Sequence, residues 1–172
     1  AEGMRRGLSW QKFARGTFMG IDQMGAHNVA IIKARLEDGK QAVVHVEEVY
    51  GPDPFARCDE LMEAYGVQVC VLEQLPNFND AQRFAARHER RVFLCDGYGE
   101  IADDVMRWGD GPRLDASERR TNEEERTRYT VRIDQHKAMA MSLGRLVNTG
   151  CLFPDPQALL QDIRIKEAVE TK

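Results

Sequence analysis

Two acidic residues stand directly after short apolar runs, and together they could bind a divalent metal ion. Asp22 follows residues 18–21, and Glu73 follows residues 69–72. If these runs are neighbouring parallel strands, both carboxylates emerge at the same edge of a sheet, which is where the functional sites of open α/β sheets gather. Two carboxylates this close repel each other, so the pair favours a bound divalent cation, and hard oxygen ligands select Mg²⁺ or Mn²⁺.

The chemistry that such a pair supports is phosphodiester hydrolysis. Two cations about 3.5–4 Å apart can activate a water molecule and stabilise the leaving oxygen. Gly20 and Gly25 lie on either side of Asp22 and would let a phosphate backbone approach closely. Asp22 alone has a structural explanation, because an Asp after a strand is a common turn former. The prediction therefore depends on finding both acids at the ends of strands.

Three β-prone segments open the expected domain: residues 17–21, 28–34 and 42–50. The dipeptide Asp38-Gly39, between the second and the third segment, is a strong hairpin signal. We therefore expect three consecutive antiparallel strands. A helix should follow, with Asp53 as its N-cap, Pro54 in its first turn and Gly66 at its end.

The next segments give the expected fold class. Residues 67–72 form a compact apolar run that is typical of a buried central strand. A second helix should begin near Asn79 or Asp80, and residues 91–95 predict a fifth strand. The resulting order β-β-β-α-β-α-β is that of a ribonuclease H-like fold. This is an α/β fold whose mixed central β-sheet has a three-strand antiparallel meander, then parallel strands, with flanking helices.

The whole chain predicts one domain with an exposed excursion. We expect residues 1–16 to be an N-terminal tail or linker and residues 17–172 to form the domain, since 172 residues suit one well-buried core. Residues 97–128 are rich in polar residues and predict an exposed loop or hairpin. The remaining expected elements are a strand over residues 129–133, a helix capped by Asp134 and a last helix over residues 157–168.

Composition argues against several classes of protein. Hydrophobic residues make up 42% of the chain and charged residues 30%, which is ordinary for a globular domain. No apolar run approaches the ~20 residues that cross a bilayer, and the N-terminal residues lack a signal-peptide core, so we expect no membrane association and no secretion. The four cysteines include no Cys-x-x-Cys pair, which argues against a disulfide framework or a zinc site. The formal net charge of −4 counts against DNA binding, which usually needs a basic surface.

Several segments resemble a known family. Residues 19–25, Met-Gly-Ile-Asp-Gln-Met-Gly, are similar to the first-acid motif of the nuclease domain of the tailed-bacteriophage terminase large subunit. Residues 71–80, in which the acid is followed closely by Leu-Pro-Asn, resemble the second-acid segment of that domain. Residues 129–139 are similar to its later strand-to-helix junction, and the resemblance extends over residues 17–156.

The resemblance implies a metal-dependent endonuclease that cuts concatemeric viral duplex DNA during genome packaging, with two Mg²⁺ or Mn²⁺ ions in its site. It also implies partners, namely double-stranded DNA, the terminase ATPase domain, the portal and the small terminase subunit, all in the host cytoplasm. The ATP-driven motor of the family is a separate domain. No Gly-x-x-x-x-Gly-Lys-[Ser/Thr] motif occurs in this chain, so we expect a nuclease domain without the motor.

The same resemblance implies a third metal ligand, an acid or a His on a helix near the C-terminus of the domain. Asp134 is the best candidate, which gives Asp22, Glu73 and Asp134 as the expected catalytic and metal-binding set. Asp134 is also a good helix cap, and the alternative is a third ligand beyond Lys172. The basic residues favoured for DNA contact are a compact cluster after the second acid: Arg83, Arg87, Arg90 and Arg91.

Two alternative functions share this fold. One is a Holliday-junction-resolvase-like repair nuclease, which would prefer four-way junctions to linear duplex DNA. The other is a non-catalytic ribonuclease H-like docking module of the packaging motor, which the incomplete set of acids favours. Metal binding and substrate preference distinguish the three hypotheses.

Overall fold

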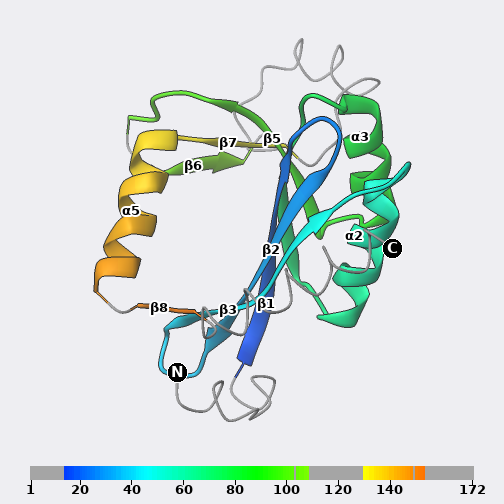
Figure 1. Cartoon of the computed structure of the whole chain (residues 1–172). Coiled ribbons are helices and arrows are strands. Elements are labelled where there is room, and N and C mark those ends of the chain that lie inside the picture. Colours follow the sequence, from blue (N-terminus) through cyan, green and yellow to red (C-terminus); the bar gives the residue numbers. More distant parts are fainter. Residues whose placement is uncertain (1–13, 103, 109–129, 149, 154–172) are drawn as a thin grey trace.

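A single sheet with helices on both sides makes up the described part of the chain. The computed structural model describes residues 14–102, 104–108, 130–148 and 150–153 (Figure 1). The strands are β1 (Ala14–Gln23), β2 (Asn28–Leu36), β3 (Gln41–Val49), β4 (Val69–Glu73), β5 (Val92–Tyr98), β6 (Met106–Trp108), β7 (Thr130–Ile133) and β8 (Cys151–Leu152). The helices are α2 (Pro54–Ala64), α3 (Phe78–Arg87) and α5 (Gln135–Val147).

The strand order of the sheet is β6-β7-β5-β4-β1-β2-β3-β8. Strands β1, β2 and β3 form an antiparallel meander, β4 pairs parallel to β1, and β5 pairs parallel to β4. Parallel neighbours cannot be joined by a tight hairpin, so α2 and α3 supply the crossover connections before and after β4. This mixed α/β sheet with flanking helices confirms the fold class that the order of the elements predicted.

The ends of α2 follow from local signals in the sequence. The side chain of Asp53 accepts hydrogen bonds from the backbone amides of Phe55 and Ala56. Pro54 occupies the first turn, where its missing N–H costs no helical hydrogen bond. Gly66, just past the end of the helix, has a φ of 57°, a left-handed conformation that glycine adopts without steric cost. The predicted start and end of this helix are therefore confirmed.

The hydrophobic core lies between one face of the sheet and the helices α2 and α3. Along β1, every second side chain from Thr17 to Gln23 is buried and those between them are exposed. The two apolar ones, Met19 and Ile21, pack with apolar residues of α2 and α3 in one cluster. Figure 1 shows these two helices together on one side of the sheet and α5 on the other. We call the side that α2 and α3 cover the covered face, and the opposite side the open face.

Some elements differ from the expectations. Strand β1 begins at Ala14, inside the stretch expected to be a tail. Strand β6 lies within residues 97–128, which were expected to be a loop or hairpin, and it pairs antiparallel with β7. Strands β6 and β8 have only 3 and 2 residues, too few for a periodic pattern to show. Residues 109–129 and the helix expected over residues 157–168 lie outside the described residues.

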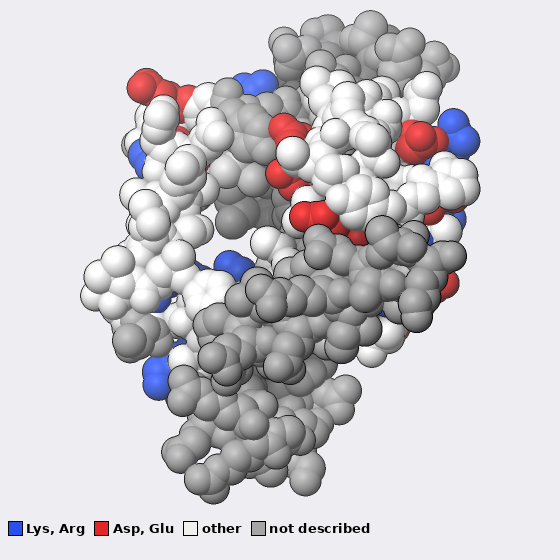
Figure 2. All heavy atoms as spheres, viewed as in Figure 1, with Lys and Arg blue, Asp and Glu red and all other residues white. Residues whose placement is uncertain are grey.

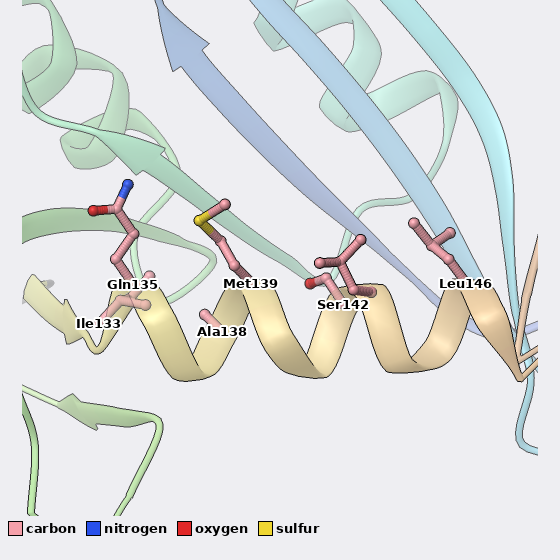
Figure 3. A pocket seen from close by; sticks show the side chains of 7 residues that line it. Ile133, Gln135, Ala138, Met139, Ser142 and Leu146 are labelled. Carbon is pink, nitrogen blue, oxygen red and sulfur yellow. The ribbon is translucent and has the colours of Figure 1, made fainter.

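Helix α5 forms where Asp134 predicted it, but its apolar stripe is exposed. Met139, Leu143, Leu146 and Val147 are between 41% and 79% exposed. A hollow of about 450 Å³ lies along this stripe, and Figure 3 shows Met139 and Leu146 pointing toward the strands. The described residues that line the hollow are uncharged and mostly apolar. No helix among the described residues is both long and apolar enough to span a membrane.

Replacing Leu72 by alanine tests the placement of the core next to Glu73. Leu72 is 0% exposed, and a buried Leu→Ala change costs about 2–5 kcal/mol, because apolar burial is lost and a cavity remains. Urea unfolding measures this change in the free energy of unfolding. Leu143→Ala is the matched control, because Leu143 is 57% exposed and a surface change should stay within about 0.5 kcal/mol. Equal losses at the two positions would contradict this placement.

Candidate active site

The pairing of β1 with β4 brings Asp22 and Glu73 side by side. The two strands are parallel and in register, and Ile21 opposite Leu72 is their last pair. Ile21 and Leu72 are both buried in the core on the covered face. Because successive side chains of a strand alternate between faces, the next residue of each strand points to the open face. Neighbouring strands lie about 4.8 Å apart, so the two carboxylates share one small area at the carboxyl end of these strands.

The surface around this acid pair is accessible. Asp22 is exposed, and Glu73 is half-buried. Gly20 lies on the same face, two residues before Asp22, and a Cβ atom added to it would meet no heavy atom within 4 Å beyond its chain neighbours. In Figure 2, acidic side chains lie close together in the area that the β1–β2 hairpin occupies in Figure 1. An approaching ligand would therefore meet negative charge and open space.

The acid pair fits part of the ligand set of a hard divalent cation. Mg²⁺ is usually held by one or two carboxylates, while water and the phosphate oxygens of a substrate complete its octahedron. Asp22 and Glu73 can supply these carboxylates. Over the ranges that the structure describes, no group of three or more His, Cys, Asp or Glu side chains could hold a metal ion. Among the described residues, the acid pair could therefore supply carboxylates for one cation, and the two-cation site stays a prediction.

A further acid, Glu48, lies on the open face but away from the acid pair. The register places Val29 opposite Asp22 and Glu48 opposite Val29. Glu48 is therefore two strands from Asp22, a separation of about 10 Å. Its carboxylate accepts a hydrogen bond from the hydroxyl of Tyr50 at 2.6 Å. Glu48 therefore presents a carboxylate on the same face as Asp22 and Glu73 but is too far from them to be part of the acid pair.

Asp134 caps α5 and does not lie beside the acid pair. One of its carboxylate oxygens accepts from the backbone amide of Lys137 at 3.0 Å and the other from that of Ile101 at 3.2 Å. These hydrogen bonds, the one from Lys137 first, lower the pKa of Asp134. Strand β5 separates β7 from β4, which puts Asp134 on the order of 10 Å or more from Glu73. Its role as third metal ligand stays a prediction that the geometry does not favour.

The arginines expected to contact DNA lie in the helical layer on the covered face, on α3 and the turn after it. Three of the four pair with acids: Arg83 with Asp80 at 3.5 Å, Arg87 with Asp59 at 2.8 Å and Arg91 with Glu63 at 2.9 Å. The last two pairs join α3 and the turn after it to α2. Arg90 is exposed on this turn. The structure therefore does not bring this cluster to the acid pair, which faces the opposite side of the sheet.

Two residues beside the acid pair were not singled out as site residues from the sequence. The side-chain amide of Gln23 donates to the carbonyl oxygen of Glu73 at 2.5 Å, and its side-chain oxygen accepts from the backbone amide of Asn77 at 3.3 Å. The side chain of Asn77 donates to the carbonyl oxygen of Gly25 at 3.0 Å. For Gln23, the sequence did offer a signal: a polar residue stands at a position where the alternation of β1 predicts a buried side chain.

Cysteine chemistry is not supported in this fold. The four cysteines are buried and none of them forms a disulfide: Cys58, Cys70, Cys95 and Cys151. Burial raises the pKa of the Cys58 thiol to about 12 and that of Cys70 well above its ordinary value. Since the thiolate is the form that attacks substrates and binds metals, these two thiols behave as core residues.

Comparisons with known proteins give the following result. The sequence matches no family model, and no curated protein matches it. Among solved structures, RuvC of T. thermophilus in complex with a Holliday junction substrate is similar, with 16% sequence identity and a TM-score of 0.37 over 46% of this chain and 62% of that chain. The yeast mitochondrial Holliday junction resolvase Ydc2 is similar with 12% identity and a TM-score of 0.44 over 94% and 76% of the two chains. This chain thus spans less than two thirds of the RuvC chain, and superpositions this loose identify neither a family nor a substrate.

Acid titration tests the capping role of Asp134. Because its pKa in the folded protein is lowered from the ordinary value of 3.8, its stabilisation is present above that value and is lost as the pH falls through the lowered pKa. The Asp134→Asn variant should therefore be less stable than the wild type at neutral pH, and the difference should shrink in acid. Urea unfolding of the two proteins at a series of pH values measures the stability difference and its change with pH. The same difference at every pH would contradict the capping role, as would a loss of Mn²⁺ binding in the variant.

Proposed function

We propose that this chain is a divalent-metal-dependent endonuclease that hydrolyses phosphodiester bonds in DNA. The observation that carries the proposal is the register of β1 and β4, which sets Asp22 beside Glu73 at the accessible carboxyl end of the central strands. Rigid acids from separate strands, with an open approach, are what metal-assisted hydrolysis of a phosphodiester requires.

The residues of the chain have separate roles in this proposal. Asp22 and Glu73 bind the cation, and their placement on two paired strands fixes the separation of the carboxylates. When bound, the cation supplies Lewis-acid stabilisation of the phosphate and lowers the pKa of a coordinated water. Gly20 leaves the space in which a phosphate can lie beside the acid pair.

The acidic composition of the chain is compatible with a polyanionic substrate. The net charge is −4, but a bound divalent cation offsets the two carboxylates at the point where the phosphate arrives. Lys33 and Arg35 of β2 also face the open side, since Lys33 pairs with the exposed Phe18 and Arg35 lies two residues further on. They would contact phosphates further along the DNA, in place of the arginines of the helical layer.

The substrate has two candidates. The resemblance of residues 19–25 and 71–80 to the terminase large-subunit nuclease supports duplex DNA cut during viral genome packaging, with the motor, the portal and the small subunit as partners. The solved structures described above are Holliday junction resolvases by name, and neither concerns packaging. The four-way junction is therefore the first substrate to test, with linear duplex DNA beside it.

Metal-dependent cleavage tests the proposed activity. The wild type should cut DNA in the presence of Mn²⁺ or Mg²⁺, and cleavage should stop when EDTA removes the cation. Asp22→Asn and Glu73→Gln should each lower the rate by more than about 100-fold, because even the outer-shell partners of a metal site contribute about 10–100-fold. Glu48→Gln is the matched control, since it removes an acid from the same face two strands from Asp22, and it should leave the rate unchanged.

The outcomes separate the candidate functions. Faster cleavage of a four-way junction than of linear duplex supports a resolvase, and comparable cleavage of both supports a packaging nuclease. Calorimetry with Mn²⁺ shows whether the acid pair binds a cation at all. Full activity in Asp22→Asn would overturn the role of the acid pair in cleavage. No Mn²⁺ binding and no cleavage by the wild type would overturn the proposal and leave the non-catalytic docking module as the better hypothesis.

A further inference from the structure

We infer that Gln23 is a positioning residue for the acid pair, an inference that rests on the proposed function. Gln23 belongs to a small set of hydrogen bonds that joins the end of β1 to the loop after β4. We call it the Gln23 clasp, and its members are the side chain of Gln23, the carbonyl oxygens of Glu73 and Gly25, and the amide and side chain of Asn77.

The clasp begins where the backbone pairing of the two strands stops. The register of β1 with β4 ends at Ile21 and Leu72, so Asp22 and Glu73 are the first residues beyond it. Glu73 is also the last residue of β4. Asp22 still pairs with Val29 of β2 and Glu73 with Cys95 of β5, but the β1–β4 pairing itself does not reach them. The hydrogen bond from the Gln23 amide to the Glu73 carbonyl oxygen ties the two strands together one step further, at the residue that carries the metal-binding carboxylate.

Gln23 acts only through its neighbours, because its side chain lies on the covered face. It is 5% exposed, and it follows Asp22 directly, so the two side chains point to opposite sides of the sheet. Gln23 therefore reaches neither a cation nor a phosphate on the open face. Its effect on the acid pair is to fix the backbone from which Glu73 projects.

Asn77 gives the clasp its second link. It is the N-cap residue of α3, where an Asn side chain usually accepts a hydrogen bond from the first turn of its own helix. Here it makes no such capping bond. Its side-chain amide instead reaches across to the carbonyl oxygen of Gly25 in the β1–β2 turn, while its backbone amide donates to Gln23. The loop after Glu73 is thereby held against the hairpin that carries Asp22.

The amide group of Gln23 is the side chain that this arrangement needs. One end must donate to a carbonyl oxygen, and the other must accept from a backbone amide. Met has a similar length but can do neither, so it would leave the carbonyl and the amide without these partners. Glu keeps the acceptor for Asn77, loses the donor and adds negative charge behind the acid pair.

The test compares Gln23→Met with Thr17→Val, a control on the same strand and the same face. The Thr17 hydroxyl contacts the carbonyl oxygens of Tyr65 and Gly66 at 2.9 Å each, at the end of β1 away from the acid pair. Both variants lose buried hydrogen bonds, so both should unfold at a lower temperature. Only Gln23→Met should weaken Mn²⁺ binding, by about 10-fold, as expected for a partner outside the ligand shell of a metal site.

Amide hydrogen exchange gives a readout that needs no metal. The backbone amide of Asn77 should exchange faster in Gln23→Met than in the wild type and should stay protected in Thr17→Val. In Gln23→Glu, which is used alone if Gln23→Met does not fold, this amide should stay protected while Mn²⁺ binding weakens. That separation would show that the link to Glu73 matters for the cation.

The results distinguish a failure of the positioning role of Gln23 from a failure of the proposed nuclease activity. If the wild type binds Mn²⁺ and Gln23→Met binds it equally well, the positioning role is overturned and the proposed nuclease stands. The positioning role is also overturned, and the nuclease again stands, if the exchange of the Asn77 amide does not change in Gln23→Met. If the wild type binds no Mn²⁺, the proposed nuclease fails first, and the positioning role fails with it.

Discussion

Strands β1 and β4 pair as parallel neighbours in the middle of the sheet, and the register of this pairing determines the chemistry of the molecule. A slip of one residue would turn every side chain of β4 to the other face. Leu72 would then leave the core, and the charge of Glu73 would enter it, which is costly unless the charge is paired. The burial of Ile21 and Leu72 on the covered face therefore holds both carboxylates on the open one. The hydrophobic pattern that stabilises the sheet also assembles the acid pair.

The two faces of the sheet carry different features. The covered face carries the core and the helices α2 and α3, and ion pairs of Arg87 on α3 and Arg91 on the turn after it join them to α2. The open face carries the acid pair, the space beside Gly20 and the basic residues of β2. Helix α5 lies on this side as well, with its apolar stripe exposed. A polyanion would reach the carboxylates from this side without meeting the helical layer.

Polar residues of the same type have different roles in this fold. Asp22 and Asp134 both lie at the carboxyl end of a strand, yet Asp22 is exposed beside Glu73, whereas both oxygens of Asp134 accept backbone hydrogen bonds at the start of α5. Asn77 stands at a helix start too, but its side chain contacts the neighbouring hairpin and not its own helix. Partners that are distant in the sequence decide these roles, which is why residue type and local pattern did not separate a helix cap from an exposed acid beside Glu73.

The sequence by itself determined the order of the elements from β1 to β5, the ends of α2 and the acid pair. These depend on short-range physics: the period of apolar residues, the caps, the Asp-Gly turn and the position of an acid directly after an apolar run. Only the tertiary structure decided which residues, distant in the sequence, are neighbours in space. It placed Arg87 and Arg91 in ion pairs with α2 on the covered face, placed Asp134 away from the acid pair, and brought Gln23 to Glu73 and Asn77. The reason is that strand order and register join residues tens of positions apart, and no local pattern records which side of a sheet a helix will cover.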